Sequence, residues 1–162
     1  NMSSKYEGKT SNEGKSSSEG KEGEEPATIN VRAIRVDDDG DKGPRGLEDL
    51  LRLEIDFDSD TQLRNAKWKV RYMVDVVAKR YIVELGVQTE VAIHQGTNTF
   101  SFVLDAIDMS GVKRKHLINN AGLLTASLTT EDEQDVIDIN LVVQVAKVES
   151  GGLVRHILNP LR

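Results

Sequence analysis

Apolar and polar side chains alternate along most of the chain from residue 28 onward, which is the spacing of strands that bury one face. In the first run the apolar phase slips between Ala33 and Ile34, and this slip predicts a β-bulge. A polar loop at 129–134 predicts a hairpin between the last two runs. The seven runs that predict strands cover residues 29–36, 51–57, 68–74, 81–87, 100–104, 124–128 and 137–145.

Helical spacing is scarce in the same part of the chain. Residues 113–117 are the main candidate for a short helix, capped by Asp108 or Ser110 and ended by residues 119–122. Seven short strands separated by turns are typical of a two-sheet sandwich, and charges at alternate positions leave each sheet one solvent-exposed face. The sequence therefore predicts an all-β protein, an immunoglobulin-like antiparallel β-sandwich over residues 27–150.

Residues 1–26 differ in composition from the rest of the chain. Gly, Ser, Glu and Lys dominate, and the tripeptide Glu-Gly-Lys recurs at 7–9, 13–15 and 19–21. Such a segment cannot bury enough apolar area to offset a chain entropy of ~1–2 kcal/mol per residue. We expect a disordered tail, which serves either as a solubilising segment or as a repeated docking peptide.

Residues 151–162 predict an aliphatic C-terminal peptide outside the sandwich. Gly151 and Gly152 end the last strand, and the apolar residues beyond them follow helical spacing, although Pro160 disfavours a helix through its own position. Burying four such side chains contributes roughly 6–10 kcal/mol before ordering costs. The peptide is therefore expected either to fold back on the sandwich or to dock into a partner.

The last predicted strand is apolar on both faces near its end. Val142, Ala146 and Val148 share the face opposite the one that carries Ile139 and Leu141. A strand of this kind is either central in its sheet or covered by another chain. The candidate partner-binding residues are Val142, Ala146, Val148, Leu153, Val154, Ile157, Leu158 and Leu161.

Four segments, in this order and spacing, resemble the core of the anti-silencing-function histone chaperones over about three quarters of the chain. They are Ile-Asn-Val-Arg-Ala-Ile-Arg-Val-Asp at 29–37, Leu-Glu-Ile-Asp-Phe at 53–57, Trp-Lys-Val-Arg-Tyr at 68–72 and Gly-Thr-Asn-Thr-Phe-Ser-Phe at 96–102. The resemblance implies an elongated immunoglobulin-like sandwich without enzymatic activity, on which a histone helix docks at the face of one sheet. Two contact positions of that family, an acidic residue and an arginine, fall at or near Ile82 and Asp138 here.

Composition excludes several classes of function. The chain contains no Cys, so it has no disulfide framework, no thiolate metal site and no Cys nucleophile. Its net charge of −6 argues against a sequence-blind nucleic-acid binder. No run of 18 apolar residues predicts a membrane span, and no apolar stretch follows the first residues as in a signal peptide. We expect an intracellular protein, cytoplasmic or nuclear.

One acidic turn has partial calcium-loop spacing. Asp37, Asp39, Asp41 and Glu48 occupy positions 1, 3, 5 and 12 of such a loop, which supplies the hard oxygens that calcium prefers. Lys42 stands where the loop needs Gly, and a strand rather than a helix precedes it. The alternatives are a calcium loop and an acidic surface turn, and we favour the turn.

The remaining polar residues predict no catalytic site. Lys-Arg-Lys-His at 113–116 is the one concentrated basic run, and a solvated helix face is the favoured interpretation. A contact for an acidic partner surface and a nucleic-acid contact are the alternatives. The histidines, at 94, 116 and 156, have no paired spacing, and neither Gly-x-Ser-x-Gly nor a phosphate-binding loop is present. We therefore expect no enzyme, no cofactor and no metal.

The favoured hypothesis from sequence is a non-catalytic protein–protein interaction module of adaptor or chaperone type. Its partner is another protein, held on a sheet face, along an edge or by the C-terminal peptide. A histone chaperone of the anti-silencing-function type, binding core histones, is the alternative. An enzyme or metal-dependent module is the third class.

Overall fold

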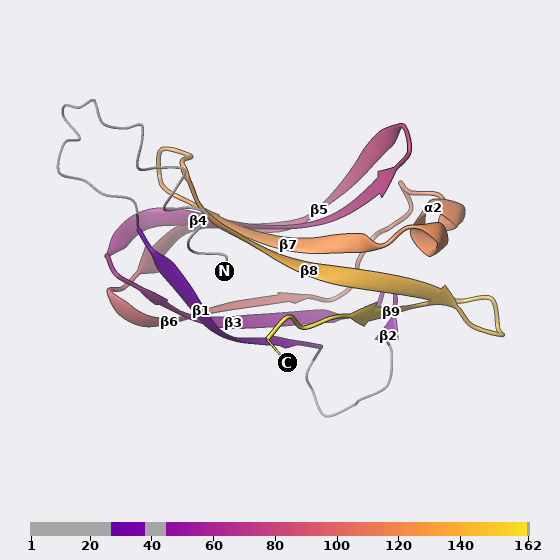
Figure 1. Ribbon diagram of the computed structural model, residues 1–162, viewed down its shortest axis with the longest axis horizontal. Coiled ribbons are helices and arrows are strands. Elements are labelled where there is room, and N and C mark those ends of the chain that lie inside the picture. The colour runs from indigo at the N-terminus through magenta and orange to yellow at the C-terminus, as the bar shows by residue number, and fades with distance from the viewer. Residues whose placement is uncertain (1–26, 38–44, 162) are drawn as a thin grey trace.

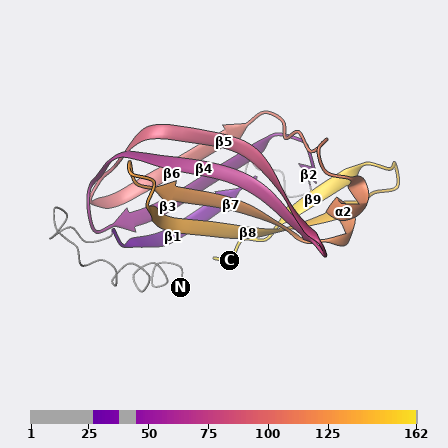
Figure 2. The same cartoon turned by 90° about the horizontal axis from the view of Figure 1, so that it is seen from above.

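The computed structural model describes residues 27–37 and 45–161, which form nine strands and one short helix. The strands make two antiparallel sheets, one in the order β1-β3-β6 and one in the order β2-β9-β8-β7-β4-β5. Figures 1 and 2 show the two sheets stacked face to face. The predicted all-β, immunoglobulin-like antiparallel sandwich is confirmed, while the tail predicted at 1–26 lies outside the described residues. The elements are β1 (Ile29–Val36), β2 (Arg45–Gly46), β3 (Leu51–Ser59), β4 (Leu63–Val76), β5 (Lys79–Ile93), β6 (Gly96–Leu104), α2 (Arg114–Asn119), β7 (Gly122–Thr129), β8 (Asp135–Lys147) and β9 (Leu153–Ile157).

The alternating pattern of the sequence becomes the inner and outer faces of these strands. In β3 every apolar residue from Leu51 to Phe57 is buried, and the charged residues between them lie on the outer face. In β1 the register against β3 shifts between Val31 and Ala33, so the predicted bulge is confirmed. The shift lets Ile29 and Ile34, which have opposite parity, both reach the core.

Aromatic packing joins the two sheets at the centre of the core. Trp68 in β4 is fully buried and stacks on Phe100 of β6 with ring centroids 4.3 Å apart. Phe57 of β3 meets the same indole edge-on at 5.7 Å. The indole of Trp68 therefore contacts both β3 and β6 of the three-stranded sheet. This one side chain helps to set the distance between the two sheets.

Residues 153–157, assigned by the sequence to a peptide outside the sandwich, form β9 and pair with β8. The two glycines do not release the chain, because they make a tight turn in which Gly151 takes φ 93. The N–H of Val148 donates to the carbonyl of Gly152 at 2.9 Å, which closes the hairpin. Three of the apolar residues spaced for a helix, Leu153, Val154 and Ile157, also fit one short strand. The open edge of β8 selects the strand.

The short helix predicted at 113–117 is present as α2. Lys113 is its N-cap residue and makes no side-chain cap hydrogen bond. Neither predicted cap residue caps it, because Asp108 accepts a hydrogen bond from the backbone N–H of Ser110 instead. Leu117 is buried, so packing against the end of the sandwich holds this helix in place.

Candidate protein-interaction surface

An apolar row crosses the outer face of the six-stranded sheet. The strand registers place Ile82 of β5 opposite Met73 of β4, Met73 opposite Leu123 of β7, and Leu123 opposite Val142 of β8. Leu158, just after β9, continues the row, because its N–H donates to the carbonyl of Val142 at 2.8 Å. Cross-strand neighbours share one face, so these five residues, here called the apolar row, lie side by side.

The apolar row faces away from the core. Its chain neighbours Tyr72, Val74, Leu124 and Leu141 are buried between the sheets, and alternation turns the row residues outward. Ile82 is 48% exposed, Val142 39% and Leu158 38%, while Met73 and Leu123 are half-buried. Single exposed aliphatic residues are normal on a protein surface, but five in register form a contiguous patch.

Polar positions border the apolar row on one side. Glu84 of β5 lies opposite Arg71 of β4, and Arg71 lies opposite Thr125 of β7. Thr125 donates from its hydroxyl to the side-chain oxygen of Asn140 in β8 at 2.9 Å. Val87, farther along β5, is the next exposed aliphatic residue on this face, beyond that polar border.

The other side of the row, nearer the tip of the β4–β5 hairpin, is also polar. Arg80 and Asp75 form an ion pair in which Nε and Oδ1 are 2.7 Å apart, and the hydrogen bond lowers the pKa of Asp75. Gln144 of β8 and His156 of β9 lie opposite one another on the same side. A stripe that is apolar in the middle and polar on both borders matches the amphipathic surface of a partner helix.

The predicted partner-binding residues are divided by the structure. Val142 and Leu158 lie in the apolar row, Ala146 and Val148 are exposed toward the β8–β9 turn, and Leu161 is exposed near the C-terminus. The three predicted residues that lie in β9, Leu153, Val154 and Ile157, are half-buried.

Sequence reasoning missed three residues of the apolar row, namely Ile82, Met73 and Leu123. Each is an apolar residue at an outward-facing position, where most of the other outward side chains of its strand are polar. This out-of-phase signal was available, but only the strand registers show that the three lie opposite one another.

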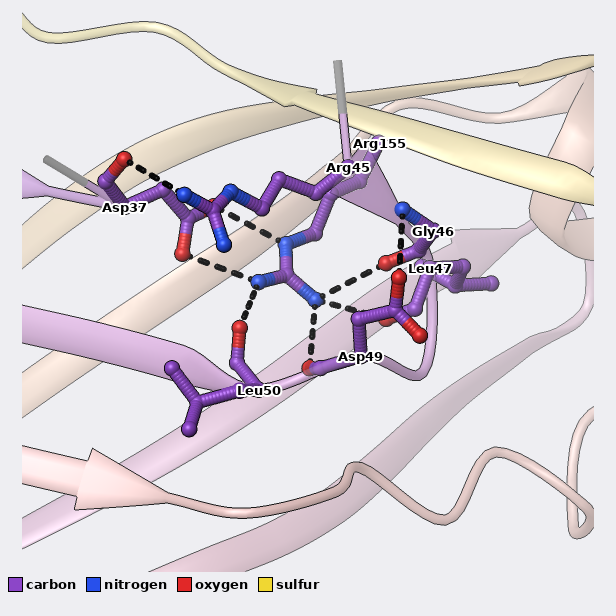
Figure 3. Close-up of polar contacts among 7 residues, drawn as sticks. All are labelled: Asp37, Arg45, Gly46, Leu47, Asp49, Leu50 and Arg155. Atoms are coloured by element: carbon purple, nitrogen blue, oxygen red, sulfur yellow. Dashed lines mark hydrogen bonds and ion pairs between the residues drawn. The ribbon is translucent and has the colours of Figure 1, made fainter. Parts of the chain in front are cut away.

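Arg155 of β9 anchors the end of the sheet that carries Leu158. Figure 3 shows its guanidinium enclosed by the turn that precedes β3 and by Asp37. Nε and Nη2 donate to the two carboxylate oxygens of Asp37 at 3.0 and 2.9 Å. The remaining N–H groups donate to four backbone carbonyls, those of Gly46, Leu47, Asp49 and Leu50.

This anchor was not predicted, because a single arginine between Val154 and His156 has the pattern of an exposed strand position. Arg155 is instead only 2% exposed. A buried guanidinium is tolerated where every N–H has an acceptor and a carboxylate balances the charge. Arg155 therefore fixes β9, and with it the start of the segment that carries Leu158.

The candidate calcium loop is only partly described. Asp39 and Asp41 lie outside the described residues. Both oxygens of Asp37 accept hydrogen bonds from Arg155, and the Glu48 carboxylate accepts one from the N–H of Met109 at 2.7 Å. Within residues 27–37 and 45–161 no group of three His, Asp or Glu side chains is placed to hold a metal ion.

The basic run at 113–116 lies at the end of the sandwich, on α2 and its N-cap residue. Arg114 donates to the carbonyl of Gly151, which links α2 to the β8–β9 turn. The imidazole of His116 stacks on Tyr81 of β5 with ring centroids 5.4 Å apart.

Among the described residues, no helix has the length and apolar character needed to cross a membrane.

No protein-family model matches this chain, and no curated protein matches it.

Proposed function

We propose that this protein is a non-catalytic protein-interaction module that binds an amphipathic helix of a partner along the apolar row. The observation that carries the proposal is the register of five outward-facing apolar side chains across one sheet face. The proposal keeps the intracellular location, cytoplasmic or nuclear, expected from the sequence.

The length of the row indicates the size of the partner segment. Neighbouring strands lie about 4.8 Å apart, so the four intervals between Ile82 and Leu158 span about 19 Å. An α-helix rises 1.5 Å per residue, so about 13 residues, or between three and four turns, cover that span. Apolar residues at intervals of three and four would place one side chain against each strand.

The energy of such a contact is moderate. Covering a half-exposed aliphatic side chain contributes roughly 1 kcal/mol, so five in the row and five in the partner contribute about 10 kcal/mol. Association costs about 4–15 kcal/mol in lost freedom, which is of the same size. The row alone therefore supports weak to moderate binding, and polar contacts beside it determine affinity and partner choice.

The test uses a synthetic helical peptide of about 18 residues that presents four leucines on one face and neutral side chains elsewhere. Its affinity is measured by fluorescence anisotropy for the wild-type chain, for Val142→Asp and for Val103→Asp. Val103 is 51% exposed on the outer face of the other sheet and is the matched control. We expect Val142→Asp to weaken binding at least about tenfold, because a carboxylate would be covered by apolar groups.

The control variant Val103→Asp is expected to bind like the wild type. Equal losses in both variants, or no binding to the wild-type chain, would contradict the proposed site. Circular dichroism and thermal melting of each variant check that the fold is intact.

A histone chaperone of the anti-silencing-function type is the alternative proposal, supported by the sandwich fold that the resemblance implies. Ile82, one of the two positions singled out by that resemblance, lies in the apolar row, and Asp138 lies on β8. Incubation with purified core histones distinguishes the alternatives. A complex that survives 0.5 M salt and is lost in Val142→Asp favours the histone chaperone, and no such complex removes it.

A further inference from the structure

The strand β5 leaves one edge of the six-stranded sheet open. It is the last strand in the order of that sheet and pairs with β4. Figure 1 shows the tip of the β4–β5 hairpin curving away from the rest of the sandwich. Within residues 27–37 and 45–161, no group other than the pairing strand β4 makes a hydrogen bond to the backbone of residues 79–87. An open edge of this kind is a template for another strand.

The half of β5 nearer the hairpin tip is a regular strand. Its register against β4 is unbroken over residues 79–84, and the three register shifts between the two strands lie beyond that segment. Farther along β5, Gln88 donates from its side chain to the carbonyl of Ser101 in β6 at 2.8 Å. Bulges and added side-chain bonds hinder further pairing, so the regular segment is the part of β5 that can accept a new strand.

Alternate backbone groups of this segment point away from β4. The turn at 77–78 has two residues, so the pair that flanks it is a hydrogen-bonded pair. In an antiparallel ladder, hydrogen-bonded pairs alternate with pairs whose N–H and C=O groups point outward. The outward groups on this edge are therefore those of Arg80, Ile82 and Glu84.

The side chains around Ile82 make the segment complementary to a second copy of itself. Arg80 and Glu84 lie two residues to either side of Ile82, and both are exposed on the same outer face. Val77 and Val87 lie five residues to either side; Val77 is fully exposed and Val87 is 51% exposed. Two such segments, paired antiparallel with Ile82 opposite Ile82, bring each arginine opposite a glutamate and each Val77 near a Val87.

The two charged groups have capacity for this contact. Among the described residues, Glu84 forms no ion pair. Arg80 binds Asp75 through Nε and Nη2, which leaves Nη1 for a second carboxylate. Opposite charges that face one another across two strands stabilise the pairing.

The same charges determine the register. Moving the centre of the pairing by one residue in either direction keeps outward backbone groups opposite one another, but it puts Ile82 opposite Arg80 or Glu84. The register centred on Ile82 pairs opposite charges twice and places the aliphatic side chains together. Because the same patch serves on both copies, the contact is closed and does not continue into a fibre.

We propose that two copies of this chain form a two-fold symmetric dimer by antiparallel pairing of residues 79–85 of β5. The two six-stranded sheets then become one continuous sheet. The two-fold axis is perpendicular to that sheet, so the apolar rows of both copies lie on the same face and meet at Ile82. The dimer goes beyond the proposed function, because it forms without a helical partner and doubles the length of the row.

Sedimentation equilibrium over a range of micromolar concentrations tests the dimer. The wild-type chain is expected to show a monomer–dimer equilibrium. Arg80→Glu and Glu84→Arg each put like charges opposite one another, so each variant should weaken dimerisation at least about tenfold. An equimolar mixture of the two single variants should restore the dimer, because every reversed charge then faces an opposite one.

Ile82→Pro tests the backbone pairing. Proline is tolerated in an edge strand where its position has no N–H bond to its neighbour, so circular dichroism of the variant should match that of the wild type. The variant lacks an N–H that the second copy needs and should dimerise at least about tenfold more weakly. Ile82→Val keeps that N–H and is the matched control, expected to dimerise like the wild type.

A further control separates the dimer from helix binding. Val142→Asp lies at the far end of the apolar row and should dimerise like the wild type, although it weakens binding of the helical peptide. A wild-type chain that stays monomeric, single charge variants that dimerise normally, or a mixture that restores nothing would each overturn the dimer. Loss of the dimer in Val142→Asp would show association through the apolar row and would also overturn it. Failure of the helical peptide to bind would contradict the proposed function alone.

Discussion

The two sheets present different outer faces to solvent, although both are built from the same alternating pattern. On the three-stranded sheet, charged side chains pair across the strands, Arg32 with Asp58 and Arg35 with both Asp56 and Glu54. On the six-stranded sheet, the apolar row crosses four strands and continues to Leu158.

The difference shows which outer face has its side chains paired with one another and which leaves apolar side chains exposed. Cross-strand ion pairs satisfy one another and contribute roughly 0.2–1 kcal/mol each without any partner. Among residues 27–37 and 45–161, the outward apolar residues Ile82, Val142 and Leu158 stay exposed. Among the described residues, Val103 is the only exposed large aliphatic residue of the three-stranded sheet. The six-stranded sheet is therefore the side on which we place binding.

The largest expected effect comes from removing the support that both faces share. Trp68→Ala should cost roughly 3–5 kcal/mol of unfolding free energy, because it leaves a cavity between the sheets. Urea denaturation followed by circular dichroism measures this loss, with Val103→Ala as a surface control expected to change stability by less than about 0.5 kcal/mol. A neutral Trp68→Ala would mean that the inner and outer faces of β4 are assigned the wrong way round.

Loss of the buried guanidinium should come next. Arg155→Met should cost about 3–5 kcal/mol, because it leaves the carboxylate of Asp37 and four carbonyl groups without their donor. The same urea experiment measures it, and the double variant Arg155→Met/Asp37→Asn should recover part of the loss. A cost below about 1 kcal/mol would show that β9 does not depend on this anchor.

A pair of smaller substitutions separates the two faces by their readouts. Arg35→Ala should cost about 0.5–1 kcal/mol of stability, since its ion pairs are partly exposed, and should leave peptide binding unchanged. Ile82→Ala should change stability by less than about 0.5 kcal/mol and weaken binding of the four-leucine peptide. The comparison fails if both variants change the same property.

The smallest effect is a pH dependence confined to the charged face. Hydrogen bonds from Arg35 and Thr99 lower the pKa of Asp56 below its ordinary value of 3.8. A carboxyl whose pKa is lower in the folded protein stabilises it above the unfolded pKa, and this contribution disappears as the pH falls through the folded pKa. Stability should therefore decrease below about pH 4, and less steeply in Asp56→Asn than in wild type. Identical slopes in the two proteins would contradict the role of the pair.

Much of the fold follows from the sequence because alternation is a local property. The seven predicted strands and the bulge in β1 need only the order of apolar and polar residues around positions such as Leu53 and Ile34. The strand β9 was not predicted because the segment 153–157, with apolar residues at 153, 154 and 157, is compatible with either a helix or a strand. Only the free edge of β8, a long-range feature, determines its conformation.

The candidate site depends on more long-range information than the fold does. Val142 and Leu158 were found from sequence because they occur in visibly aliphatic segments. Ile82, Met73 and Leu123 are single residues in different strands, and strand order together with register brings them into one row. Arg155 was missed because charge alone does not reveal burial, which here requires a carboxylate and four carbonyls from distant segments.

Methyl NMR tests most directly whether the two outer faces differ in binding. The neutral helical peptide with four leucines on one face is titrated into the chain labelled at Ile, Leu, Val and Met methyl groups. We predict shifts concentrated at Ile82, Met73, Leu123, Val142 and Leu158, with the methyl groups of Val103 unmoved. Shifts at Val103 of equal size, or shifts spread evenly over both sheets, would contradict a binding site on the six-stranded sheet.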